Sequence, residues 1–86
     1  MFAKTAIKRT GRDRFVRNAL IALGNSGDPD LAPHAERRLD DASPLVRAMA
    51  VWALSRLALP DRFGALRNRH LSGESDADVR SEWLAA

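Results

Sequence analysis

The stretch ALIAL at residues 19–23 returns 31 positions later as AVWAL at residues 50–54. The pair Pro29-Asp30 returns at the same interval as Pro60-Asp61, and a third copy begins where Val46-Arg47 reappears as Val79-Arg80, 33 positions on. Self-similarity at a fixed spacing is the sequence signature of repeat architectures. The sequence therefore predicts two whole units of about 30 residues and part of a third.

The first unit predicts two helices. Its first helix runs from about Arg12 to Leu23 and places on one face the residues Phe15, Ala19, Ala22 and Leu23. Thr10 and Asp13, three positions apart, form a capping pair for that helix, and the segment GNSG at 24–27 ends it because Gly and Asn tolerate a left-handed backbone. A second helix begins at Asp28-Pro29, where Asp caps and Pro occupies the first position, and runs to about Asp40.

The same signals place three more helices. Ser43-Pro44 begins a helix over 45–58 that is apolar on nearly every side and is expected to be the most buried element. Pro60 begins a fourth helix, and 76–85 form a short fifth one. No segment alternates with a period of two, so strands are not expected. Residues 1–9 show no clear period and are predicted to form an extended lead-in from which Phe2 and Ile7 dock.

Two helices per unit, with small residues at their contacts, predict an all-α, HEAT-like α-solenoid of about five helices in antiparallel pairs. The chain then forms one domain over 1–86, with a basic lead-in at 1–11, repeat one at 12–41, repeat two at 43–72 and a partial third repeat or cap helix at 75–86. Such a stack is short and its ends are bare, so we expect the segment to come from a larger protein. The predicted buried residues are Phe15, Ala19, Leu23, Val46, Ala50, Ala53, Leu54, Leu57, Leu66 and Trp83.

The charge of the chain is unevenly distributed. The formal net charge is +3, yet residues 1–20 hold six Lys or Arg and one Asp, or +5, and the other 66 residues hold eight and ten, or −2. Hydrophobic content of 45% with 29% charged residues is typical of a folded domain, and no apolar run is long enough for a membrane span. The uneven charge predicts one edge that binds a polyanion.

Catalytic and metal-binding patterns are absent from the sequence. The chain has no cysteine, which excludes disulfides and thiolate metal sites and fits a cytoplasmic protein. His34 is predicted to lie on a helix surface and His70 to have a packing or helix-end role, since neither belongs to an HExxH pattern. Trp52 is interpreted as a core residue in preference to a base-stacking one. For Arg47 and Arg80 we predict pairing with acids of a neighbouring repeat.

The segment KTAIKRTGRDRFVRN at 4–18 is the candidate binding site. It places six positive charges around the predicted start of the first helix, with Phe15 among them. Lys and Arg side chains that reach successive phosphates give salt-dependent affinity for nucleic acid. A solvated basic face explains the same composition equally well.

Two stretches carry a resemblance to a known family. IKRTGRDRFVRN at 7–18, followed by LIALGNSGD at 20–28, is similar to the start of the HEAT-like C-terminal domain of epoxyqueuosine reductases, and PLVR at 44–47 with AVWAL at 50–54 resembles that domain's second repeat. In that family a cobalamin-binding domain and a ferredoxin-like domain with two 4Fe–4S clusters precede the repeats. The enzyme reduces epoxyqueuosine to queuosine in the anticodon loop of tRNA, and the repeats help to hold the tRNA.

The resemblance implies that this chain has a binding and scaffolding function. Without cysteines the chain supplies no catalytic residue and binds no cofactor of its own, so the iron–sulfur and cobalamin chemistry is expected upstream. The expected partners are the tRNA anticodon region and the upstream catalytic domains of the same chain. Expected nucleic-acid contacts are Lys8, Arg9, Arg12, Arg14, Arg17 and Asn18, with Asn25 in a polar or structural role. The alternative is a HEAT-type protein–protein interaction module whose concave surface holds a partner peptide.

Overall fold

The fold is known from a computed structural model that describes the backbone of residues 2–85 and the side chains of residues 11–85. Five α-helices follow one another: α1 (Phe2–Ser26), α2 (Ala32–Glu36), α3 (Pro44–Leu57), α4 (Pro60–His70) and α5 (Ala77–Ala85). Short 3-10 turns flank α2 and follow α4, and residues 2–85 contain no strand. The all-α, solenoid-like architecture is as the sequence predicted.

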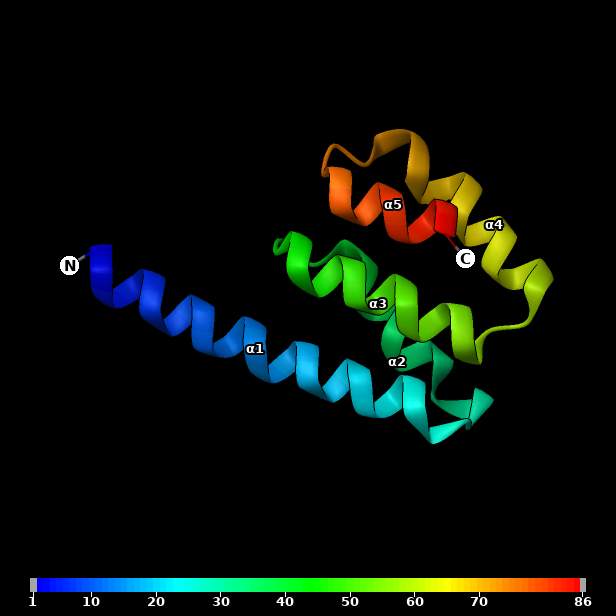
Figure 1. Cartoon of the computed structure of the whole chain (residues 1–86), viewed down its shortest axis with the longest axis horizontal. Coiled ribbons are helices and arrows are strands. Elements are labelled where there is room, and N and C mark those ends of the chain that lie inside the picture. Colours follow the sequence, from blue (N-terminus) through cyan, green and yellow to red (C-terminus); the bar gives the residue numbers. More distant parts are fainter. Residues whose placement is uncertain (1, 86) are drawn as a thin grey trace.

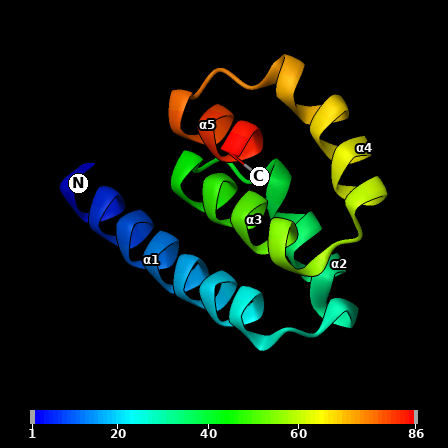
Figure 2. The ribbon, with the colours of Figure 1, turned by 45° about the vertical axis from the view of Figure 1, so that its right-hand side comes forward.

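Helix α3 is the centre of the molecule. Helices α1 and α5 lie along opposite sides of it, and α2 packs against it from a third direction (Figures 1 and 2). Helix α4 contributes Phe63 and Leu66 to the same core, and the Phe63 ring lies 5.2 Å from the Trp83 ring of α5. The alternate helices α1, α3 and α5 therefore form one layer in which each packs on the next, as expected of stacked helical repeats.

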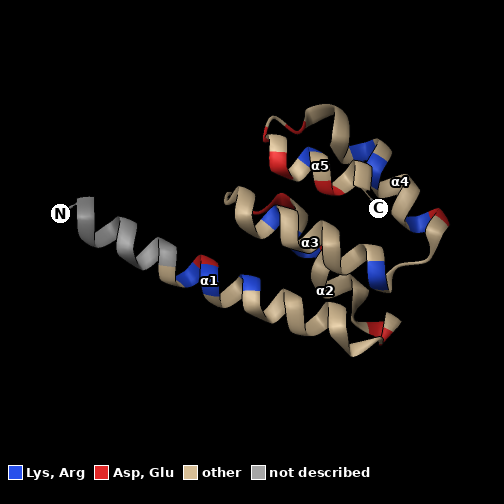
Figure 3. Cartoon of the chain, in the orientation of Figure 1, with Lys and Arg blue, Asp and Glu red and all other residues tan. Residues whose placement is uncertain are grey.

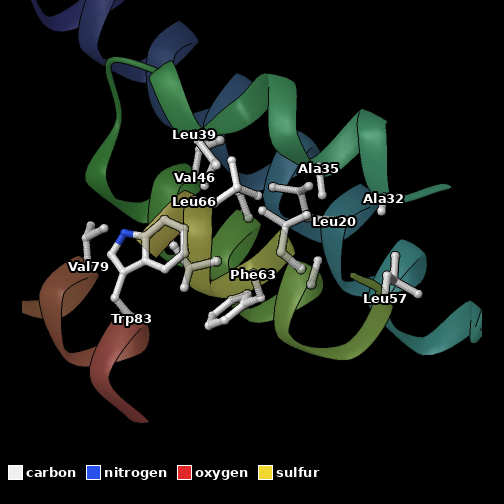
Figure 4. Close-up of a cluster of buried hydrophobic side chains, with 14 residues drawn as sticks. Leu20, Ala32, Ala35, Leu39, Val46, Leu57, Phe63, Leu66, Val79 and Trp83 are labelled. Carbon is white, nitrogen blue, oxygen red and sulfur yellow. The ribbon is translucent and has the colours of Figure 1, made fainter. Parts of the chain in front are cut away.

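The buried core is apolar throughout, and no polar side chain among residues 11–85 is buried with it. Six of its residues come from α3 (Val46, Ala50, Val51, Ala53, Leu54 and Leu57), which confirms that α3 is the most buried element. The other helices surround it with side chains that include Leu20, Ala35, Leu39, Val79 and Trp83 (Figure 4). Trp83 has an exposed fraction of 1%, so this large side chain joins α5 to the rest.

Local signals at the helix ends act largely as predicted. Helix α1 ends at Ser26, three residues later than predicted, and Gly27 has φ +70°, the left-handed conformation that ends it. The Asp28 carboxylate accepts a hydrogen bond from the Asp30 N–H, and Asp76 accepts from the N–H groups of Asp78 and Val79, which caps α5. Each such bond satisfies donors that a helix start leaves unpaired.

The first helix is longer than predicted. Helix α1 begins at Phe2, so the expected extended lead-in is wrong over 2–9, and Thr10 does not begin a helix. An isolated glycine costs a helix only about 1 kcal/mol, so Gly11 does not interrupt it. The predicted docking of the Phe2 and Ile7 side chains lies outside the described residues.

The second predicted helix is shorter than expected. The span 28–40 divides into a 3-10 turn (Pro29–Leu31), α2 and a second 3-10 turn (Arg37–Asp40). Pro33 has no N–H to donate to the preceding turn, so a regular α-helix cannot run through it from Pro29. It begins one residue before Pro33 instead.

The packed face of α1 also differs from the prediction. Phe15 is 75% exposed, Ala19 and Ala22 are exposed, and Leu23 is half-buried. The residues that pack inward are Val16, Leu20 and Gly24, at the spacing i, i+4, i+8, and the predicted Leu23 packs against the core beside them. Both sets make an apolar stripe along a helix, and only the position of α3 decides which of them is covered.

Candidate nucleic-acid interface

Arg12 is the predicted contact residue with the most defined surroundings. Its guanidinium binds the Asp41 carboxylate through two hydrogen bonds, Nη1 to Oδ1 at 2.9 Å and Nη2 to Oδ2 at 2.5 Å, and Nη1 also lies 3.0 Å from Asp13 Oδ1. The Arg12 side chain is 46% exposed, whereas that of Asp41 is 6% exposed. Arg12 therefore joins α1 to the segment that precedes α3, and one edge of its guanidinium is already bound to a carboxylate.

This pairing shifts both ionisation equilibria. The hydrogen bond to Asp41, and then the one to Asp13, raises the pKa of Arg12. The hydrogen bond from Arg12 lowers the pKa of Asp41 against the opposing effect of burial, and the Ser43 N–H adds to the lowering. Both groups thus stay charged at neutral pH.

Arg14 and Asn18 lie on a different side of α1. They are one helical turn apart and both are exposed, so they form a short polar stripe. Arg17 is half-buried, and its Nε has no hydrogen-bond partner among the described residues. At roughly 100° per residue, Arg14 and Arg17 differ by about 60° around the helix, while Arg12 lies about 140–160° from both. The basic residues of α1 that Figure 3 colours are thus divided between two sides of the helix.

The side chains of Lys8 and Arg9, the other two predicted basic contacts, lie outside the described residues.

Arg47 makes the ion pair that the sequence predicted. Its Nε and Nη2 bind the two carboxylate oxygens of Glu74 at 2.9 and 3.0 Å, and Nη1 donates to the carbonyl oxygens of Asp41 and Ala42. Burial raises the pKa of Glu74, but the hydrogen bonds from Arg47 and the Asp76 N–H outweigh it, and the net pKa is below the ordinary value. Arg80 differs from the prediction, because its Nη1 donates to the carbonyl oxygens of Leu71 and Glu74 and no acid partner is found among residues 11–85.

Sequence reasoning did not identify the two acids of these pairs, Asp41 and Glu74. They are 33 positions apart, Asp41 shortly before α3 and Glu74 shortly before α5. Each accepts two hydrogen bonds from one arginine of the preceding helix in the layer, which is α1 for Asp41 and α3 for Glu74. The same 33-residue interval separates Val46-Arg47 from Val79-Arg80, so the spacing was available as a signal. The two pairs join α1, α3 and the segment before α5 into one series of ionic contacts.

The remaining candidate residues are the two histidines and Trp52. His70, in the last turn of α4, stacks on Trp83 with ring centroids 6.0 Å apart, and His34 is exposed on α2, both as predicted. Trp52 is half-buried against the core, with Arg56 over its ring and Gly24 at its edge. Arg56 Nε also donates to the Gly24 carbonyl oxygen at 3.1 Å, which joins α3 to the end of α1.

The side chains of this chain do not fit an iron–sulfur cluster. Clusters are held mainly by cysteine thiolates, and the sequence contains no cysteine. Among the described residues no group of three His, Asp or Glu lies close enough together to hold a metal ion. None of the helices in that part of the chain has the length and apolar character to cross a membrane.

The family model of HEAT repeats matches residues 5–86. This chain belongs to the HEAT-repeat family. Over 54 residues it is also 41% identical to the epoxyqueuosine reductase of Xanthomonas campestris pv. campestris, a stretch that makes up 62% of this chain and 15% of that protein. The match thus spans less than a sixth of that relative's length. No solved structure matches the chain.

Proposed function

We propose that this HEAT-repeat chain is a tRNA-binding and scaffolding module of a protein like epoxyqueuosine reductase. The observation that carries the proposal is the 41% identity to an epoxyqueuosine reductase, in a chain whose first 20 residues hold a net charge of +5. By resemblance, the parent protein reduces epoxyqueuosine to queuosine in the anticodon region of tRNA, in the cytoplasm, with 4Fe–4S clusters and cobalamin bound upstream. The repeats would hold the tRNA against those catalytic domains.

The geometry refines which basic residues would carry the contact. Arg12 already binds Asp41, so a phosphate would have to compete with a carboxylate that the same guanidinium neutralises. Arg14 and Asn18 are exposed, and no acid pairs with Arg14 among the described residues. Arg14 is therefore the strongest candidate of the described set, with Lys8, Arg9 and Arg17 as further members and Arg12 in a mainly structural role.

A charge-reversal experiment tests the proposal. Lys8→Glu combined with Arg14→Glu should weaken binding of tRNA several-fold or more, because each reversal replaces a phosphate attraction with a repulsion. Four phosphate contacts, from Lys8, Arg9, Arg14 and Arg17, should give wild type a log–log salt slope between about −3 and −4, at roughly 0.7 to 0.9 per contact. Fluorescence anisotropy with labelled tRNA across a salt series measures both.

The matched control reverses two arginines of the 3-10 turn after α2, Arg37→Glu with Arg38→Glu, which should change tRNA binding much less. Circular dichroism should show that all variants keep their helices, since Arg14, Arg37 and Arg38 are exposed. If the Lys8/Arg14 variant binds tRNA as tightly as wild type, the basic segment is a solvated surface and the proposed RNA contact is wrong.

A further inference from the structure

A groove lies between α1 and the α2 region, outside the basic stripe of Arg14 and Asn18. Its volume is about 180 Å³. Its floor is apolar and comes from α1 (Phe15, Val16, Ala19, Leu20 and Leu23), and its edge is formed by His34, Arg37 and Arg38. Phe15 is 75% exposed at this groove, which makes it the most exposed large hydrophobic side chain described. An aromatic ring left in water beside an apolar groove is typical of a surface that a partner covers.

The internal repeat indicates which kind of structural element would cover the groove. Residues 15, 19 and 22 of α1 correspond, at the 31-residue interval, to Val46, Ala50 and Ala53 of α3. These three residues of α3 have exposed fractions of 0%, because α1, α2, α4 and α5 all pack around α3. Helix α1 has no such neighbour among the described residues, so the corresponding face, with its small residues, is open to the close approach of a helix.

The edge of the groove identifies the charge of the occupant. Arg37 is exposed with no carboxylate bound to it among the described residues, and the Arg38 guanidinium lies 3.9 Å from Asp41 with its side chain 46% exposed. No acidic residue among those with described side chains lines the groove. A helix seated there would place its flanking side chains against two arginines and a histidine, so carboxylates would fit and lysines would be repelled.

We propose that this groove binds an acidic amphipathic α-helix of a partner protein. The apolar stripe of that helix covers Phe15 and the small residues of α1, and its carboxylates pair with Arg37 and Arg38, a helix-in-groove mode. A second copy of this chain is disfavoured as occupant, because like faces would bring the arginines of both copies together. RNA is disfavoured as occupant because the arginines lie only at the edge, and the apolar floor between them suits the apolar face of a helix better than a sugar–phosphate backbone.

A defined peptide tests the proposal with the 86-residue chain. The probe is a fluorescein-labelled 18-residue helical peptide with leucines at i, i+3, i+4 and i+7 spacing and glutamates beside them, and the matched probe has lysine at every glutamate position. We expect the glutamate peptide to bind and the lysine peptide to bind about tenfold more weakly or not at all. Phe15→Ala should lower the affinity for the glutamate peptide by about tenfold, and Arg37→Glu should lower it several-fold.

The control variants change exposed residues of α4 and α5 that do not line the groove. Leu84→Ala, which truncates an exposed leucine of α5, and Arg69→Glu on α4 should leave peptide binding unchanged. Phe15 and Arg37 contribute nothing to the core, so their variants should keep the melting temperature of wild type.

Three outcomes would overturn the proposal. These are no detectable binding of the glutamate peptide, equal binding of both peptides, or equal effects of the groove and control variants. Dimerisation of the chain that Phe15→Ala abolishes would make a second copy the occupant, and loss of tRNA binding in Phe15→Ala without loss of peptide binding would make the groove an RNA surface.

The inference stands apart from the proposed tRNA contact. The Lys8→Glu/Arg14→Glu variant should bind the glutamate peptide as wild type does. The Arg37→Glu variant should bind tRNA nearly as wild type does. Failure of one pair of experiments therefore leaves the other intact.

Discussion

Helices α1 and α3 carry the same repeated pentapeptide pattern, yet they have different surroundings. Leu20 of α1 and Val51 of α3, at equivalent positions, are both buried. Ala19 and Ala22 are exposed, whereas their counterparts Ala50 and Ala53 have exposed fractions of 0%. The difference shows that burial in a stack of repeats depends on the neighbours of a helix as well as on its own sequence. The same residue type at the same repeat position should therefore have different energetic importance in the two helices.

The largest expected difference is between two equivalent leucines. Leu54→Ala should lower the free energy of unfolding by about 2–5 kcal/mol, because it leaves a cavity in a small core. Leu23→Ala, at the equivalent position of α1, should cost only about 1 kcal/mol, since Leu23 is half-buried and water can fill the space it leaves. Urea denaturation of the two variants measures this, and equal losses would mean that α1 and α3 are covered alike.

A glycine comparison within α1 tests how closely that helix approaches α3. A Cβ atom at Gly24 would lie only 2.9 Å from Cη2 of the Trp52 ring, whereas one at Gly11 would meet nothing within 4 Å. Gly24→Ala should therefore destabilise the protein by about 1–3 kcal/mol through overpacking. Gly11→Ala should instead stabilise it by up to about 1 kcal/mol, because alanine is the better helix former. Thermal unfolding followed at 222 nm distinguishes the two, and a stabilising Gly24→Ala would show that α1 lies farther from Trp52.

Two of the bidentate ion pairs, Arg12–Asp41 and Arg47–Glu74, form the next comparison. The Arg47 and Glu74 side chains are 18% and 10% exposed, and Arg47 also holds two backbone carbonyls. Arg47→Ala should cost about 1–2 kcal/mol, since it leaves the Glu74 carboxylate and the two backbone carbonyls without this donor. Arg12→Ala should have a smaller effect, because the Arg12 side chain is nearly half exposed and water can replace it at Asp41. Urea midpoints of both variants test the order, and a larger loss for Arg12→Ala would reverse it.

The smallest expected effect is a pH dependence. The pKa of Glu74 and that of Asp41 are both lower in the folded chain than their ordinary values. Each carboxylate therefore adds stability that is fully present above its unfolded pKa and is lost as the pH falls through its folded pKa. We expect a urea midpoint that is steady between pH 7 and about pH 5 and falls below about pH 4.5.

A conservative variant assigns part of that fall to one pair. Glu74→Gln should be less stable at pH 7 and should lose less stability on acidification than wild type, because the glutamine cannot be protonated in that range. A midpoint profile parallel to that of wild type would show that Glu74 contributes nothing to the pH dependence. Asp41→Asn provides the matched measurement at the pair that involves α1.

The sequence by itself determined the all-α class, the positions of α3, α4 and α5, and most of the core of the second unit. These features depend on local signals, namely proline at helix starts, glycine at the end of α1 and apolar residues on nearly every side of α3. They also depend on the repeat interval, which is visible in the sequence alone. The sequence also predicted the pairing of Arg47 with an acid, whereas the same prediction for Arg80, its counterpart in the repeat, was wrong.

Only the tertiary structure decided which face of α1 is covered and which arginines remain available for binding. Phe15 with Ala19 and Val16 with Leu20 make equally good helical stripes, and the choice between them depends on where α3 lies. Arg12 and Arg14 are two residues apart in one basic segment, yet only Arg12 lies within reach of Asp41, 29 positions away. A contact between residues so distant along the chain depends on how the helices pack against one another. The periodicity within one helix carries no information about that packing.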